Sequence, residues 1–480
     1  MAKADYARQM FKQIEEMMKK CDGLTQEVKE SRKEIKRLNN RIEVLEIENQ
    51  ILKEDNDRLR KIINNDSNNS SKPPSTDIKP NTKIYNSREK STKKAGGQAG
   101  HKGHNLSKRD IEEKIKTGEL KHKIIKHGPK SEQYKSKYIL DIEINAIAQE
   151  HRFYADANGN YNIPEEFKTD VQYGTNLKTL CTTLNIEGYV ALDRLEGFVK
   201  NLTHEKLTPS KGTIVNFIQE CNNKSEYIIE NIKQKLLNAT LIHTDATVSR
   251  CNNKNQSVRD YSTNEVTLLI GTQGKSKKHI EETGILPKYK GTLIHDHETV
   301  IYNYGSKHGE CNVHILRYLK GCIENTKHQW AKDMSSLLRC TNHSKKQREK
   351  FETSQLERIS KRYDEILQKG LEENKKLKSR YYKQDEKRLL RRLQKYKENH
   401  LLFAYDFNIP FDNNLSERDL RNVKSKLKIS GCFRNEKGMQ NYLTLQSIIG
   451  TCRKKALNFY EIIEKIFKNI PVEIWVNWDV

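Results

Sequence analysis

The sequence lacks any apolar run near the roughly 18 residues that a bilayer-spanning helix needs, and its N-terminus has no apolar signal core. We therefore expect no membrane association and a cytoplasmic location. Acidic residues are also too few to balance the basic ones. The chain has 64 Asp and Glu against 88 Lys and Arg, so its formal net charge is +24. A field of this sign predicts a polyanionic partner, most simply nucleic acid.

Paired cysteines are missing as well. The nine cysteines are scattered, odd in number and never spaced as Cys-x-x-Cys, which is typical of free thiols in a reducing compartment. Cys311 and His314 have the spacing of metal ligands, but no matching second pair accompanies them. Packing roles on a helix are the better interpretation of these two residues.

Residues 1–65 carry a heptad repeat that predicts a coiled coil. Leu at d with Ile and Asn at a favours a parallel dimer, because a buried Asn pairs with its twin and disfavours other registers. The alternative is a long helix packed on its own protein. Gly23 and Ser31 weaken the first half of the repeat. The d positions are Met10, Met17, Leu24, Ser31, Leu38, Leu45, Leu52 and Leu59, and the a positions are Ile14, Cys21, Val28, Ile35, Ile42, Asn49, Asn56 and Ile63.

Residues 66–109 are predicted to be a basic linker, because a stretch so rich in Pro, Ser and Asn cannot bury a core. Within it, glycines at 96–104 let the backbone approach a phosphate closely, and Lys102 supplies a charge. A flexible tether explains this segment equally well. Residues 110–170 then predict a small mixed module with strand-like patches, such as 137–144.

Residues 171–237 have a helical pattern with basic flanks. Ser210 is a good N-cap for the helix that runs through Phe217. Short helices joined by tight turns allow a DNA-binding helix-turn-helix interpretation, although generic helical packing explains the pattern equally well.

The remaining sequence, 238–470, predicts an α/β domain with a helical insertion. Alternating strands and helices indicate the α/β class, and the whole chain is therefore a multidomain α/β and α protein. A last helical stretch is expected from 415 to about 468, interrupted near Gly431, with a tail at 471–480. Strands are predicted at 239–245, 266–271 and 291–296, a helix at 275–286, and the basic helical insertion at about 327–400.

Three acids stand out in this domain. Asp245 and Asp296 end two predicted strands, where catalytic groups gather in α/β sheets. Glu417 at the head of a helix would add a third carboxylate, and such an oxygen-rich site fits Mg²⁺ or Mn²⁺. A pair of such ions promotes in-line phosphoryl displacement. An Asp after a strand is as often a turn former or helix cap, so the case rests on all three acids together with the charge.

The helix that carries Glu417 is otherwise faced with cations. On a 3.6-residue period, Glu417 shares one side with Arg421, Lys424 and Lys428. This pattern suits a surface that grips a polyanion while the acid holds a metal ion. A solvated surface helix with salt bridges one turn apart is the alternative.

Several segments together resemble the large catalytic (TnpC-type) subunit of insertion sequence 66 family transposases, which are DDE enzymes. The resemblance covers nearly the whole chain, and its most specific run is FDNNLSERDLR at 411–421, extended by SGCFR at 430–434. The other matching segments are NSSKPPS (69–75), GGQAGHKGH (96–104), QYGTNL (172–177), HTD (243–245), HDH (295–297) and CNVHILR (311–317).

The resemblance implies a leucine zipper, a small zinc-binding module, a helical region and a ribonuclease H-like catalytic domain. It implies that Asp245, Asp296 and Glu417 form the catalytic triad and bind Mg²⁺ or Mn²⁺. It places His314 and Arg317 near the active site in a supporting role. The cations expected to contact DNA are Lys102, Arg418, Arg421, Lys424, Lys426, Lys428 and Arg434.

The sequence departs from the family pattern at three places. No cysteine occurs between Cys21 and Cys181, so zinc is not expected in the 110–170 module. Ala246 follows Asp245 where the family usually has Asp-Glu-Thr. The strand expected at 257–261 lacks its usual aromatic residue.

The sequence therefore predicts a nucleoid-associated DNA transposase that dimerises through its zipper. It would bind the terminal inverted repeats of an insertion sequence, with small accessory transposition proteins as further partners. It would cut and join DNA by metal-dependent phosphoryl transfer. The alternative is a catalytically decayed copy that acts only as a dimeric DNA-binding protein or repressor. A pure coiled-coil scaffold fits the net charge poorly.

Overall fold

The computed structural model describes residues 2–64, 107–128, 135–167 and 169–470. The chain divides into two compact units. The helical unit comprises Met1–Ile84 and Cys311–Phe411, and the sheet unit comprises Tyr85–Glu310 and Asp412–Val480. No helix in the described ranges is both long enough and apolar enough to cross a membrane.

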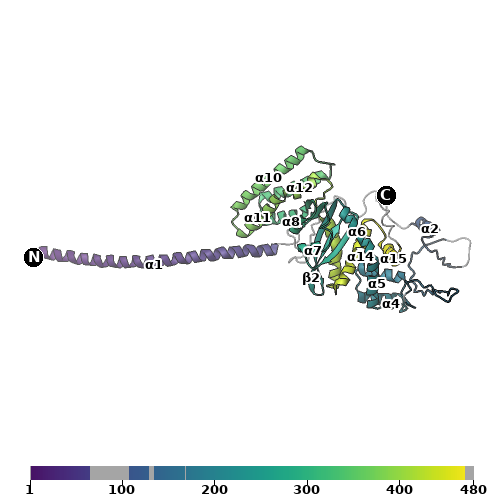
Figure 1. Cartoon of the computed structure of the whole chain (residues 1–480). Helices are drawn as coiled ribbons and strands as arrows, with labels where there is room; N and C mark the ends of the chain where they lie inside the picture. The colour runs from purple at the N-terminus through teal and green to yellow at the C-terminus, as the bar shows by residue number, and fades with distance from the viewer. Residues whose placement is uncertain (1, 65–106, 129–134, 168, 471–480) are drawn as a thin grey trace. The chain divides into compact units, whose positions relative to one another are not determined.

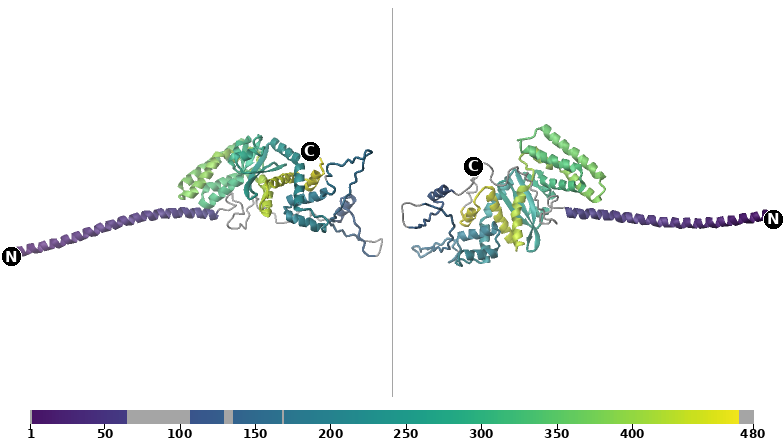
Figure 2. Two further views of the ribbon diagram at one scale, coloured as in Figure 1. Left: turned by 60° about the horizontal axis from the view of Figure 1, so that its bottom comes forward. Right: turned by 180° about the vertical axis from the view of Figure 1, so that it is seen from behind.

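The helical unit begins with one continuous helix, α1 (Ala2–Asn64), which Figure 2 shows as an unbroken rod. At 1.5 Å per residue it is about 95 Å long, and the long N-terminal helix expected from the heptads is confirmed. Its d-position side chains are open to solvent, with Leu38 52% and Leu45 44% exposed. Within the described residues, only the end of α1 contacts the rest of its unit, where Lys61 pairs with Asp385 and Tyr382 donates to the Asp57 carbonyl. An apolar seam left exposed along the remainder of a long helix is typical of one strand of a coiled coil.

The other helices of this unit share a core of their own. Trp330, Tyr363 and Leu390 are almost fully buried in it. Helical structure spans 312–405, more than the predicted insertion at 327–400, because apolar residues at both ends of the segment join the same core. The helices are α8 (Asn312–Thr326), α9 (Gln329–Lys345), α10 (Thr353–Lys376), α11 (Arg380–Lys395) and α12 (Lys397–Tyr405), of which all but α9 are labelled in Figure 1.

The sheet unit is built around a five-stranded mixed sheet, which confirms the predicted α/β class. The strand order is β3-β2-β1-β4-β5. The pairs β1–β2 and β2–β3 are antiparallel, whereas β1–β4 and β4–β5 are parallel. The strands are β1 (Leu241–Cys251), β2 (Lys254–Ser262), β3 (Thr267–Thr272), β4 (Thr292–His295) and β5 (Lys307–Glu310).

The first two strands form a hairpin that the residue pattern did not predict. Asn252 and Asn253 both have positive φ, 48° and 59°, which is the backbone of the tight turn that favours Asn at these positions. β2 is rich in polar residues, yet its last seven residues are buried. Its polar side chains must therefore find partners inside the protein.

Helices cover the sheet, and the buried apolar residues of the helices and the strands form one hydrophobic core. α13 packs on β1 and β2, and α14 packs on β3. The predicted break at Gly431 is confirmed, with φ 74°. The predicted N-cap Ser210 is confirmed too, since its hydroxyl accepts a hydrogen bond from the Thr213 N–H. The helices are α3 (Thr175–Ile186), α4 (Leu192–Leu202), α5 (Lys211–Lys224), α6 (Glu226–Asn238), α13 (Asn414–Ser430), α14 (Glu436–Lys454) and α15 (Phe459–Phe467).

Two predicted elements differ from the structure. The helix expected at 275–286 is only one short turn, α7 (Lys277–Glu281), because the chain turns at Gly284 with φ 72°. The strand expected at 137–144 does not form in the described residues. Its apolar side chains are exposed, Ile139 by 91%, so no packed face stabilises a strand there. Before this segment lies α2 (Lys108–Lys116).

Candidate active site

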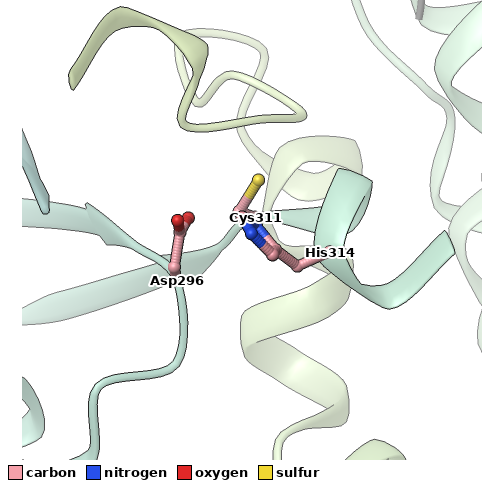
Figure 3. Close-up of side chains that lie close together, drawn as sticks. All are labelled: Asp296, Cys311 and His314. Carbon is pink, nitrogen blue, oxygen red and sulfur yellow. The ribbon is translucent and has the colours of Figure 1, made fainter. Parts of the chain in front are cut away.

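The strand register brings the two aspartates to the same level of the sheet. In the parallel pair β1–β4, His243 lies opposite Ile294. Asp245 and Asp296 each follow two residues later, so they lie next to one another where the parallel pairing ends. The prediction that β1 ends at Asp245 is wrong, since the strand continues to Cys251 in its hairpin with β2. Asp296 does follow directly after its strand, as Figure 3 shows.

The charge of Glu417 acts on Asp245, one of these two aspartates. Burial, together with the charges of Asp296 and Glu417, raises the pKa of Asp245 to about 6. The Ala246 N–H and the Lys275 ammonium act in the opposite direction. The charge of a carboxylate shifts the pKa of a second carboxyl group only when the two lie near one another. The structure thus brings the three predicted acids together in one unit.

Asn413 fixes the start of α13 against β1. This fully buried side chain accepts a hydrogen bond from His243 Nδ1 at 3.0 Å and donates one to the Thr244 carbonyl at 3.0 Å. Its own carbonyl accepts the Glu417 N–H at 3.3 Å. One side chain therefore connects the strand beside Asp245 to the first turn that carries Glu417.

The segment after Asp296 is held by Glu310, which ends β5. His297 Nδ1 lies 2.6 Å from the Glu310 carboxylate, and the Tyr302 hydroxyl donates to the same oxygen. Glu310 is 2% exposed, so both contacts form in a place where water does not compete. They restrict the chain that immediately follows Asp296.

Lys275 is a basic residue of the site that sequence reasoning missed. It is exposed, but its ammonium donates to the Ala246 carbonyl at 2.6 Å and lowers the pKa of the neighbouring Asp245 carboxyl. It lies in the loop after β3, where no motif or periodicity singled it out. Only the fold brings it beside Asp245.

Five of the predicted DNA-contacting cations are exposed on or just after α13. Within the described residues none of them forms an ion pair, so the alternative of a salt-bridged surface helix is not what the structure shows. They are Arg418, Arg421, Lys424, Lys428 and Arg434.

Lys426 does not fit the predicted DNA contact. Its side chain is buried, donates to the Asn185 carbonyl at 3.1 Å and lies over the Tyr442 ring. It falls on the inner side of α13, towards Asn185 of α3 and Tyr442 of α14. The predicted contact by Lys102 lies outside the described residues.

The supporting residues His314 and Arg317 belong to the helical unit. Both lie in the first half of α8, and Arg317 donates to His314 Nε2 at 3.2 Å. Cys311 is fully buried at the N-cap of the same helix. Figure 3 labels Cys311 and His314 at this end of α8.

The triad suits a divalent cation by its chemistry. Its donors are all carboxylate oxygens, the ligands that Mg²⁺ and Mn²⁺ prefer. Burial, and then the charges of Asp296 and Glu417, raise the pKa of Asp245 and so disfavour its ionised form. A divalent cation would favour that ionised form.

The match to known families agrees with this geometry. The model described as Transposase IS66 family matches residues 170–441, more than half of the 480 residues, and includes all three acids. The chain belongs to this family. Its members are DDE transposases, phosphoryl-transfer enzymes that act on DNA and generally use divalent metal. The five-stranded sheet with its helices is consistent with their ribonuclease H-like domain.

A second family model covers the N-terminal part of this transposase. It is described as a family of unknown function (DUF6444), and it matches residues 12–107. That range includes most of α1. No curated protein matches the chain.

Proposed function

We propose that this transposase binds the terminal inverted repeats of an insertion sequence and cuts and joins DNA at Asp245, Asp296 and Glu417. The observation that supports this most strongly is geometric: the register of β1 and β4 sets Asp245 beside Asp296 where their parallel pairing ends, and α13, with Glu417 in its first turn, packs on β1. The exposed, unpaired cations of α13 begin on the same helical turn as Glu417. A metal site beside a cationic face is what a phosphodiester substrate requires.

The three carboxylates would hold Mg²⁺, with Mn²⁺ as a substitute. Ions bound there would activate the attacking oxygen and stabilise the leaving one. Water would be the first nucleophile and a 3′-hydroxyl the second, with no covalent bond to the protein. Lys275 and Arg421 would bind phosphate oxygens of the strand being cut, because exposed cations without ion pairs are free to replace counterions on DNA.

The remaining predicted partners follow from α1 and the family. The exposed seam of α1 supports a homodimer. Small accessory transposition proteins and a cytoplasmic, nucleoid-associated location stay predictions from the sequence.

The test is metal-dependent cleavage and joining of DNA that carries the element's ends, with the full-length protein. Asp296→Asn should abolish Mg²⁺-dependent strand cleavage and joining, because it removes one anionic ligand, while DNA affinity stays the same or rises slightly. Asp170→Asn is the matched control, since Asp170 is an exposed acid, and this variant should cleave and join like the wild type.

The alternative is a dimeric DNA-binding protein or repressor without catalysis. Ala246, which stands where the family usually has Glu, is the observation that favours it. A wild-type protein that binds the DNA ends but neither cuts nor joins them with Mg²⁺ or Mn²⁺ would establish this alternative and exclude the enzyme.

A further inference from the structure

β2 carries two adjacent buried ionisable side chains at its centre, one basic and one acidic. Arg259 is 2% exposed and Asp260 is fully buried. Because successive side chains of a strand point to opposite faces, the two serve different sides of the sheet. Buried groups of this kind persist only with partners, and three of the partners here lie within two residues of Asp245, Asp296 or Glu417 in the sequence: Thr244, Glu298 and Ser416.

Arg259 connects the two strands that carry the aspartates. One guanidinium nitrogen lies 3.4 Å from the Thr244 hydroxyl, and another forms a 2.6 Å ion pair with Glu298. Thr244 immediately precedes Asp245, and Glu298 lies two residues after Asp296. The planar guanidinium therefore fixes both backbone segments with one rigid group.

Asp260 does the same for the third acid. It lies directly opposite Asp245 in the antiparallel β1–β2 register, so it shares the face on which α13 packs. Its Oδ2 accepts a 2.6 Å hydrogen bond from the hydroxyl of Ser416, the residue before Glu417. This bond ties the first turn of α13 to the centre of β2.

The hydrogen bonds around Asp260 also indicate the protonation state of its carboxyl group. Ser262 Oγ lies 2.8 Å from Asp260 Oδ1 and 2.6 Å from Asp419 Oδ2. A hydroxyl has one proton to donate, so both contacts are hydrogen bonds only if Asp260 donates one of its own. Asp419 takes the donated protons because it is ion-paired with Lys454 at 2.7 Å and accepts from Thr267 at 2.8 Å.

The electrostatic environment of Asp260 agrees with a protonated carboxyl group. Burial, and then the charge of Asp419, raises the pKa of Asp260 well above its usual range. The contribution of Asp260 to the site is its hydrogen bonding, through Oδ2 to Ser416 at the start of α13 and through Oδ1 to Ser262 on its own strand.

We propose that Arg259 and Asp260 are positioning residues, which set the spacing of the metal-binding carboxylates from the centre of β2. Arg259 acts through Thr244 and Glu298, and Asp260 acts through Ser416. This inference rests on the proposed metal site, and removing these links should weaken metal binding without removing a ligand. Groups that orient metal ligands from behind typically change metal affinity about 10–100-fold.

The test is Mn²⁺ binding by the full-length protein, followed by electron paramagnetic resonance in the absence of DNA. Ser416→Ala and Glu298→Ala should each weaken Mn²⁺ binding by about tenfold or more. In cleavage assays, the metal concentration for half-maximal rate should rise more than the saturated rate falls. Ser430→Ala is the matched control, because Ser430 is on the same helix but donates only to its own backbone, at Lys426.

Substitutions of Asp260 separate positioning from simple packing. Asp260→Asn keeps a neutral group that can accept from Ser416 and donate to Ser262, so it should bind Mn²⁺ close to the wild type. Asp260→Leu should bind it about tenfold or more weakly. Near-ultraviolet circular dichroism reports the fold of each variant, and Ser416→Ala decides the question if Asp260→Leu does not fold.

The outcomes distinguish the two proposals. A wild type that binds Mn²⁺ alongside Ser416→Ala and Glu298→Ala variants with unchanged affinity would overturn the positioning roles and leave the metal site intact. A wild type that binds no Mn²⁺ would overturn both.

Discussion

Lys426 shows at the scale of one residue how a helix divides its cations between core and solvent. Its ammonium donates to the Asn185 carbonyl and lies 5.6 Å from the centroid of the Tyr442 ring. Burial lowers its pKa to about 8, from the 10.5 of an exposed lysine. The sequence predicted a DNA contact here, because charge alone does not tell which side of α13 faces the interior of the protein.

Lys426 should make stability depend on pH. Between pH 8 and 10.5 the unfolded chain binds more protons at this residue than the folded chain does, so wild-type stability rises with pH over that window. Lys426→Met lacks this effect. The variant should be more stable than the wild type at pH 7 by on the order of 1–3 kcal/mol, and its advantage should shrink towards pH 10.5. Guanidinium unfolding at several pH values measures the difference, and a constant difference would contradict the buried, titrating lysine.

At the scale of the element, α13 has a carboxylate at its start, a packed inner side and a cationic outer side. Its inner side is set by buried residues such as Leu420 and Val423. Glu417 lies in the first turn, where a helix N-terminus favours negative charge. Because the inner side is fixed by packing, Arg421 and Lys424 are held outwards together.

This outer side should contribute to DNA binding in a salt-dependent way. Lys424→Met should weaken DNA binding and reduce the slope of log affinity against log salt by about 0.9, the value for one lost phosphate contact. Lys426→Met should leave the slope unchanged, because that ammonium is buried. Titrations by fluorescence anisotropy at several salt concentrations measure both. Equal slopes for Lys424→Met and the wild type would remove Lys424 from the DNA interface.

Elements with a strong pattern of apolar residues could be predicted from the sequence, whereas β2 could not. The heptads of α1 and the apolar runs before Asp245 and Asp296 gave the long helix and the sheet class. β2 has polar residues at most of its buried positions, so neither alternation nor hydrophobicity indicated a strand. Only the family resemblance placed one at 257–261.

In the candidate site, too, some residues could be predicted from the sequence and others could not. Its three acids could be predicted from strand ends and the family motif. The residues that surround them, Asn413, Arg259 and Lys275, are single polar residues whose roles come from contacts distant in sequence. Such contacts leave no local signal, because they depend on register and helix packing that only the fold defines.

At the scale of the whole molecule, α1 is expected to join two copies of the chain. Its d-position leucines are about half exposed along the described helix, and Asn49 and Asn56 at a positions favour a parallel pair. A dimer would let two active units engage the two ends of one element, which raises their effective concentration for each other.

The dimer can be tested with two substitutions that differ in heptad position alone. Leu45→Lys puts a charge into the d seam and should convert the protein to a monomer. Ile47→Lys changes an apolar residue at an f position that is also exposed, by 57% against 44% for Leu45, and should remain dimeric. Light scattering after size exclusion measures the mass, and a dimer that survives Leu45→Lys but not Ile47→Lys would refute the zipper.

The central claim is that Asp245, Asp296 and Glu417 form one divalent-metal site. Mn²⁺ binding to the full-length protein, measured without DNA, tests it most directly. The wild type should bind Mn²⁺, and each of Asp245→Asn, Asp296→Asn and Glu417→Gln should weaken binding by at least about tenfold, since each removes an anionic ligand. A wild type that does not bind, or a triple variant that binds as tightly as the wild type, would contradict the account.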